Sequence, residues 1–288
     1  MLRHKIMYAL SLIMLITFTS CDVINKIGNQ FGQATKKPDS MGNIVRNQPS
    51  LRGGNQQKQN NTEGDREQPQ YEIITAVYKE KDIKISYPRL ENMIENEKMS
   101  IINDILKNEA IKIAEDQKQE NEKPKMEINY DIKFKGKNLL SVVYTGKSDK
   151  EGALYKKNLF YTTNINLKDA IRLTLSDFMI LNEGLVEKLK KAEYKPYDSD
   201  GQARKDKVKE EIEKKDLLKE LERTDNIREE NVSNFYSYIK PDALGISIGV
   251  THSSGDHAEY EIKYEDIKEF IREETKILDE VLNKQSQK

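Results

Sequence analysis

The strongest strand pattern in the chain lies at Met126–Phe134, which reads MEINYDIKF. Apolar and polar residues alternate strictly along it, as they do in a strand with one buried face. Gly136-Lys137-Asn138 follows with turn composition, and Leu139–Thr145 then returns as a second apolar stretch. This segment predicts an antiparallel hairpin, and with it a sheet built from strands that follow one another along the chain.

Further strand and helix patterns extend this hairpin in both directions. Strands are predicted at Tyr71–Lys79, Ile83–Tyr87 (ended by Pro88), Leu159–Leu167, Ile171–Leu175, Phe235–Ile239 and Leu244–Val250. Amphipathic helices are predicted at Leu90–Lys118 and Tyr264–Leu282, with a short helix that Ser176 caps and that has Asp177 in its first turn. The predicted fold class is therefore α+β, a mostly antiparallel sheet with packed amphipathic helices.

Residues 183–230 are densely charged, with Lys and Glu interleaved. A single apolar stripe runs through them: Val208, Ile212, Leu217, Leu218 and Leu221. A coiled coil or a nucleic-acid-binding face would also contain such charges. Because both signs alternate and the stripe is short, we expect a solvated helix with one face on the core.

The N-terminus has the pattern of an export signal. Residues 3–5 are positively charged, and Ile6–Phe18 is an apolar run, long enough for a signal peptide and too short to span a membrane. The small residues Thr19 and Ser20 then precede Cys21, the only cysteine of the chain, and resemble a bacterial lipobox. We expect residues 1–20 to be a lipoprotein signal peptide and Cys21 to carry the lipid; an ordinary cleaved signal with a chance cysteine is the alternative.

Residues 21–70 are predicted to form a disordered tether. Residues 22–70 contain 7 Asn, 8 Gln, 6 Gly and 3 Pro, with one aromatic residue, Phe31. Such a composition buries too little apolar area to offset the entropy of ordering the chain. The expected location is the extracytoplasmic face of the cell membrane, where acyl chains contribute about 0.8 kcal/mol per buried CH₂. Two α+β subdomains are predicted to follow, at 71–150 and 151–282.

The net charge of the chain limits the kinds of molecule that we expect it to bind. The chain has 48 Lys and Arg against 49 Asp and Glu, and residues 71–288 alone have 39 against 44, a net charge of −5. Nucleic-acid binders usually present a basic face, so we expect no nucleic-acid partner.

The segment His252–His257 holds the only cluster of ligand-like residues. His252, Asp256 and His257 are weak candidates for a metal site, and Ser253 or Ser254 with His252 and Asp256 is a conceivable hydrolase triad. A catalytic zinc needs three ligands on rigid elements, and triads usually draw on separate segments. Ser-Ser-Gly-Asp is turn composition, so we expect an exposed turn, no metal or other cofactor, and no catalytic residue.

Tyrosines are the other candidates for recognition, because the chain has no Trp. Those at strand positions could form a sugar-binding platform, but core or cross-strand packing is the expected role. They are Tyr71, Tyr78, Tyr144, Tyr155, Tyr161 and Tyr236. A glycosidase pair among the abundant carboxylates stays open.

Several short stretches resemble, in the same order, one known pair of domains. They are Tyr87–Leu90, Ile101–Ile105, Leu140–Tyr144, Gly152-Ala153, Asn164–Leu167, Leu173–Phe178, Asn234–Tyr236 and Glu261–Ile267. Residues 71–275 are thereby similar to the tandem domains of unknown function in the extracellular part of the lysozyme-sensing anti-sigma-V factor. The same pair precedes the catalytic domain of a peptidoglycan deacetylase. Leu154 stands where this family has His, and the His252–His257 turn replaces its Gly-Pro-Tyr loop.

The resemblance implies an envelope-facing module and carries over no enzyme activity. We expect a stand-alone, membrane-anchored lipoprotein whose non-catalytic module binds or senses peptidoglycan or an envelope protein. The alternatives are a lysozyme-binding lipoprotein and a cell-wall hydrolase that uses the His252–His257 turn.

Overall fold

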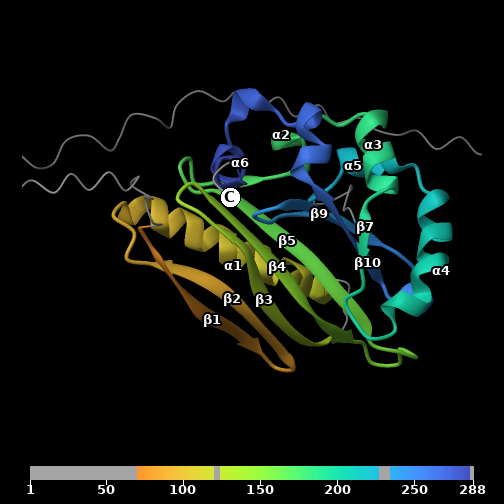
Figure 1. Cartoon of the computed structure of the whole chain (residues 1–288). Helices are drawn as coiled ribbons and strands as arrows, with labels where there is room; N and C mark the ends of the chain where they lie inside the picture. The colour runs from red at the N-terminus through yellow and green to blue at the C-terminus, as the bar shows by residue number, and fades with distance from the viewer. Residues whose placement is uncertain (1–69, 120–123, 227–233, 286–288) are drawn as a thin grey trace, which may run out of the picture. The chain divides into compact units, whose positions relative to one another are not determined.

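The structure is a computed structural model that describes residues 70–119, 124–226 and 234–285, all within one compact unit, Glu63–Lys288 (Figure 1). The predicted signal peptide, Cys21 and the tether lie outside the described residues.

Two sheets form the body. The first has six strands in the order β1-β2-β3-β4-β5-β6. These are β1 (Glu72–Glu80), β2 (Ile83–Glu91), β3 (Lys125–Lys135), β4 (Leu139–Asp149), β5 (Lys157–Asn166) and β6 (Ile171–Leu173). The second sheet has four strands in the order β7-β10-β9-β8, namely β7 (Glu193–Lys195), β8 (Phe235–Ile239), β9 (Ala243–Gly249) and β10 (His257–Lys263). All neighbours are antiparallel except β2 and β3, which pair in parallel, so the predicted α+β class is confirmed.

One long helix and several short ones accompany the sheets. They are α1 (Asn96–Gln119), α2 (Leu175–Phe178), α3 (Glu183–Lys190), α4 (Gly201–Glu213), α5 (Leu217–Glu222) and α6 (Asp279–Gln285). Figure 1 shows α1 lying across the long strands, with the shorter helices gathered around β7–β10. In the described parts, no helix is long and apolar enough to cross a membrane.

The helix α1 covers one face of the first sheet. Alternate residues of the strands point toward it, because side chains change face at every residue of a strand. The resulting core includes Met126, Ile128, Leu140, Val142, Tyr144 and Tyr161 from the strands, and Ile102, Leu106, Ala110 and Ala114 from α1. The Tyr161 hydroxyl donates to the carbonyl of Ala110 at 2.7 Å, which satisfies the buried polar group.

The second sheet lies against the opposite face of the first. Asn164 Nδ2 of β5 donates to the carbonyl of Ser237 in β8 at 2.9 Å. The hydroxyl of Ser141 in β4 donates to Asn164 Oδ1 at 2.7 Å and accepts from the backbone N–H of Ile239 at 2.9 Å. The interface between the sheets is therefore held by buried hydrogen bonds as well as by apolar contact.

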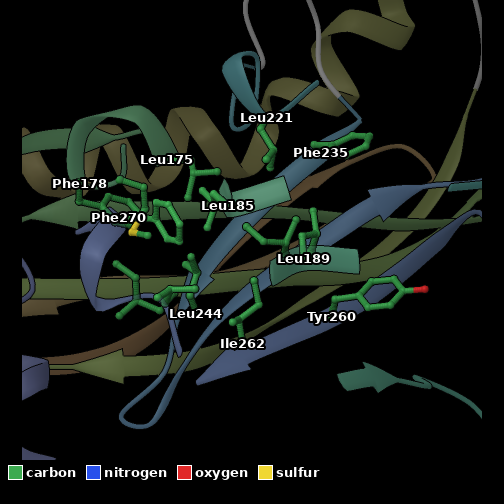
Figure 2. Close-up of a cluster of buried hydrophobic side chains, with 14 of the residues drawn as sticks. Leu175, Phe178, Leu185, Leu189, Leu221, Phe235, Leu244, Tyr260, Ile262 and Phe270 are labelled. Atoms are coloured by element: carbon green, nitrogen blue, oxygen red, sulfur yellow. The ribbon is translucent and has the colours of Figure 1, made fainter. Parts of the chain in front are cut away.

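The far face of the second sheet carries the larger apolar core (Figure 2). Leucines of α2, α3 and α5 pack there on residues of β8, β9 and β10. The side chains drawn include Leu175, Leu185, Leu189, Leu221, Phe235, Leu244, Tyr260 and Ile262. The charged region 183–230 thus places its apolar stripe on the core, as predicted, through separate helices, and it contributes a strand, β7, that was not predicted.

The prediction that Pro88 ends its strand is wrong. Pro88 pairs with Thr75 of β1, and β2 runs on to Glu91. The parallel pairing of β2 with β3 covers only Ile83–Ile85, so Pro88 lies where β2 has a single strand neighbour. A proline is tolerated there because no second strand requires its missing N–H.

The predicted start of the long helix is also wrong. Leu90 belongs to β2, and α1 begins at Asn96. The side chain of Asn103 in α1 accepts from the Leu90 N–H at 2.7 Å and donates to the Leu90 carbonyl at 3.0 Å. This amide takes the place of a neighbouring strand, which stabilises Leu90 in extended conformation.

The short helix α2 is capped by Thr174 and not by Ser176, which lies inside it. Thr174 and Asp177 form a capping box, in which the Asp177 carboxylate accepts from the Thr174 N–H at 2.7 Å. Asp177 lies in the first turn as predicted, where a carboxylate favours the helix N-terminus.

The helix predicted at Tyr264–Leu282 does not form. Short 3₁₀ turns occupy Tyr264–Asp266, Lys268–Phe270 and Glu273–Thr275, and only α6 is an α-helix. The backbone bonds to another segment: Ile180 donates to the Phe270 carbonyl at 2.6 Å and Arg272 to the Phe178 carbonyl at 3.0 Å. The apolar residues still reach the core, so their spacing correctly indicated burial but not helix.

The predicted subdomain boundary at 150–151 falls within the first sheet, in the connection between β4 and β5. Strands from both sides of the boundary pair along their length.

Gly245 is required by its cross-strand neighbour. A Cβ at Gly245 would lie 2.1 Å from Cζ of Tyr238, its partner in β8. We expect Gly245→Ala to lower the free energy of unfolding by about 2–3 kcal/mol, since the ring or the strand must move. Urea unfolding measures this. Gly152→Ala is the control: its Cβ meets nothing within 4 Å, and its φ of +82° alone should cost about 1 kcal/mol. Equal losses would contradict the steric explanation.

Candidate functional site

The His252–His257 segment connects β9 to β10 as a tight turn. A 3₁₀ turn spans His252–Ser254, and Gly255 and Asp256 follow with φ of +111° and +73°. Left-handed backbone at a non-glycine residue is uncommon, and Asp tolerates it better than most residues. The predicted turn is confirmed, but the prediction that it is exposed is wrong: Ser254 is 1% and His257 is 6% exposed, because the turn packs against β5 and α4.

His252 faces outward and stacks on Tyr155. The two ring centroids are 3.6 Å apart and the planes differ by 3°. Nδ1 of His252 lies 3.0 Å from the Asp256 carboxylate. Tyr155 is 55% exposed and its neighbour Leu154 is 96% exposed, so an apolar tip lies beside the stacked pair.

Carboxylates on two sides hold the turn in place. Asp256 accepts from the N–H of Asn158 in β5 at 2.8 Å and from its Nδ2 at 3.0 Å. Glu211 of α4 accepts from the Thr251 N–H at 2.9 Å, from its hydroxyl at 2.7 Å, and from the Ser254 hydroxyl. Burial acts to raise the pKa of Glu211, but these hydrogen bonds outweigh it and the pKa is lowered. The turn is therefore rigidly attached to both sheets and to α4.

His257 points away from His252, into the space between the sheets. Its ring lies 4.9 Å from that of Phe160 and 4.2 Å from that of Tyr197. Burial lowers the pKa of His257 to about 4, so the imidazole is neutral at pH 7. Nδ1 is buried and has no hydrogen-bond partner among the described residues.

A pocket of about 280 Å³ opens beside His257. Its walls come from α1, β5, α4, β8, β9 and the turn, and they include Ile113, Asn158, Phe160, Glu211, Lys215, Tyr236, Ser247 and Asp256. Within the described ranges, the Ser247 hydroxyl is a second buried polar atom without a partner. Buried polar groups are normally satisfied, so a wall with two unsatisfied ones indicates a place for a polar ligand or for water.

The predicted metal candidates do not converge. His252 and Asp256 come together, but His257 lies on the other side of the turn. Across residues 70–119, 124–226 and 234–285, no group of three His, Cys, Asp or Glu is arranged to hold a metal ion. The hydroxyls of Ser253 and Ser254 bond to Lys207 and Glu211, respectively, so neither is placed on His252 as a triad requires.

The candidate tyrosines divide into three groups. Tyr71, Tyr144 and Tyr161 are core residues, as expected. Tyr78 and Tyr236 are partly buried, and Tyr236 lines the pocket. Tyr155 alone of the six is largely exposed.

The sequence contained no signal for the other pocket residues. Asn158, Glu211 and Ser247 belong to three elements, and none lies in a recognisable motif. Only the pairing of β5, β9 and β10 and the packing of α4 bring them to the turn.

No protein-family model and no curated protein matches the chain. Solved structures do align with it, among them two of DUF3298 family proteins. The one from Pseudomonas aeruginosa PAO1 has 9% identity and a TM-score of 0.44, over 73% of this chain and 97% of that one. The one from Bacteroides fragilis has 14% identity and a TM-score of 0.43, over 73% and 96%. The structural neighbours thus belong to a domain family of unknown function, and the relation to the anti-sigma factor and the deacetylase stays a prediction.

Proposed function

We propose that this protein is a lipid-anchored, extracytoplasmic binding module that recognises a component of the cell wall. The lipobox-like ending at Cys21 and the polar composition of the following residues support the anchor. The rigid turn and the pocket beside it support recognition. One observation carries the proposal: two buried polar atoms, His257 Nδ1 and Ser247 Oγ, belong to residues that line a pocket and make no hydrogen bond to any described residue.

The pocket favours a small, uncharged, polar ligand. Lys157 and Lys215 are balanced by Glu211 and Asp256 on its walls, and Phe160 and Tyr236 add aromatic surface. Ligand sites typically have volumes of about 300–1,000 Å³, and this pocket, at about 280 Å³, lies just below that range. Hydroxyl and amide groups on a single sugar ring could bond the two unsatisfied atoms while the ring packs on the aromatic side chains. An N-acetylated sugar unit of peptidoglycan has this chemistry.

The binding test compares the two histidines of the turn. The full chain in detergent is titrated calorimetrically with N-acetylated disaccharide fragments from purified peptidoglycan. His257→Phe keeps the aromatic packing and removes the polar atom, so affinity should fall by about tenfold. His252→Phe is the matched control outside the pocket and should leave affinity unchanged. Loss in the control alone, or binding of lysozyme without binding of the fragments, would overturn the proposed ligand.

The anchor is tested separately. Cys21→Ser should move the full chain from the detergent-rich to the aqueous phase in a phase-partition experiment, because the acyl chains supply the membrane affinity. A variant that stays in the detergent phase would show that Cys21 is not the attachment point.

A further inference from the structure

The first sheet carries a cationic hollow distant in sequence from the turn, which we call the lysine groove. It has a volume of about 530 Å³ and lies where the β1–β2 turn meets the start of β3 and the end of β4. Its lining residues are Lys79, Lys81, Asp82, Ile83, Lys84, Lys125, Met126, Glu127, Lys147, Asp149 and Lys156. Six of these eleven are lysines.

Strand register gathers these lysines on one face. Lys84 of β2 is paired with Glu127 of β3, and Glu127 is paired with Lys147 of β4. Lys125 is paired with Asp149, two residues further along the same two strands. Their neighbours Met126 and Ile128 point to α1 and are buried, so the lysines occupy the opposite face of the sheet.

The charges in the groove are only partly neutralised. Two ion pairs form, Lys84 with Glu127 at 3.2 Å and Lys156 with Asp149 at 3.7 Å. Lys79, Lys81, Lys125 and Lys147 are exposed and form no ion pair with any residue that the structure describes. Six lysines and three carboxylates leave an excess of +3 in the groove. Residues 71–288 as a whole have a net charge of −5, so this patch has the opposite sign to the rest of the body.

We propose that the lysine groove binds an extended, soluble polyanion that carries phosphate groups along its length. Lysine ammonium groups bind phosphate as point charges. Neighbouring strands are about 4.8 Å apart, so Lys84 and Lys147, two strands apart, contact charges about 10 Å from each other on one ligand chain. A concave site fits a single chain better than a flat lipid surface.

The lining also argues against a nucleic acid as the polyanion. Proteins that bind single-stranded nucleic acids stack bases on aromatic side chains. The described lining of the groove contains no aromatic residue, and its only apolar members are Ile83 and Met126. Recognition therefore rests on the charged backbone of the ligand.

The test uses the full chain in detergent with long-chain inorganic polyphosphate as the probe. The double variant Lys125→Gln and Lys147→Gln removes two charges that have no ion-pair partner in the described ranges. We expect affinity to fall by about tenfold or more, and binding of the unmodified chain to weaken steeply as salt rises. The control Lys205→Gln and Lys219→Gln removes two exposed charges from α4 and α5, outside the groove, and should change affinity less than about twofold. Thermal unfolding confirms that both variants fold.

Two further probes separate the sources of phosphate. Inorganic phosphate alone should bind far more weakly than the polymer, because it contacts one part of the groove at a time. Vesicles with anionic phospholipid should bind no better than neutral vesicles once Cys21→Ser has removed the anchor. The proposal is overturned if the control variant weakens polyphosphate binding equally, if monomeric phosphate binds as tightly as the polymer, or if the vesicles bind and polyphosphate does not. The groove shares no lining residue with the pocket beside His257, so each proposal fails independently of the other.

Discussion

Asp225→Ala is expected to lower the free energy of unfolding by about 3–4 kcal/mol, the largest loss from any single substitution considered for this chain. Asp225 lies between α5 and β8 and is 1% exposed. Its carboxylate accepts from the Ser237 N–H at 2.7 Å, from the Ser237 hydroxyl at 2.5 Å and from the Thr162 hydroxyl at 3.2 Å. Alanine would leave donors of both sheets unsatisfied in a buried interface, and a lost partner costs more than the net value of a hydrogen bond.

Asp225→Asn is the matched control. Asparagine keeps an acceptor oxygen, and it tolerates the φ of +69° at this position about as well as aspartate does. We expect it to cost about 1 kcal/mol. Urea unfolding of the three chains measures both values. Equal destabilisation by alanine and asparagine would mean that the charge of Asp225, and not its acceptor oxygens, joins the sheets.

Glu259→Gln is expected to stabilise the protein above neutral pH by roughly 2–3 kcal/mol and to have little effect near pH 4. Glu259 of β10 lies between the sheets, and burial raises its pKa to about 7, against the opposing effects of Lys133 and of the Tyr238 hydroxyl, which donates at 3.2 Å. Ionisation of Glu259 is therefore more costly in the folded chain than in the unfolded chain.

The sign of the pH dependence follows from that pKa. The folded state holds the Glu259 proton up to about pH 7, whereas the unfolded state releases it near the ordinary value of 4.5. Stability associated with this group is thus complete below pH 4.5 and is lost as the pH rises to about 7. Glutamine cannot ionise, so the advantage of the variant grows over this interval and then stays constant.

Other buried groups titrate in the same range and must be separated from Glu259. Burial raises the pKa of Asp225 to about 6, which acts in the same direction, and lowers that of His257 to about 4, which acts in the opposite direction. The difference in unfolding free energy between variant and unmodified chain, measured from pH 4 to pH 8.5, cancels both contributions. Glu265→Gln, which removes an exposed carboxylate, is the control and should not show the same gain above neutral pH. A flat curve for Glu259→Gln would refute the raised pKa.

Local sequence patterns correctly predicted those elements whose formation depends on residues close together in the chain. Alternation at Met126–Phe134 predicted β3 and the turn after it, because a half-buried strand needs only a period of two. The final segment failed for the opposite reason. Its apolar spacing suits a helix, but the Phe270 carbonyl and the Arg272 N–H bond to partners around α2 that are 90 and 94 positions away, respectively. Long-range hydrogen bonds of this kind leave no local signature.

The candidate site, too, has features that the sequence predicted and features that it did not. That His252–His257 forms a turn was predictable from its composition. The opposite orientation of the two imidazoles was not, because it depends on Tyr155 packing on one and Phe160 and Tyr197 enclosing the other.

Composition and short-range periodicity therefore specify the class of fold and the acidic balance of the body. Composition is a sum over the residues of a segment, and periodicity is a repeat among neighbouring residues, so neither requires knowledge of the tertiary structure. The pocket with its unsatisfied polar atoms and the lysine groove arise only when strands pair in one register. Lys84, Lys125 and Lys147 are dispersed in a chain of negative net charge, and the pairing of β2, β3 and β4 places them on one face. A net charge averages over the whole surface, whereas binding depends on the local field that the folded sheet creates.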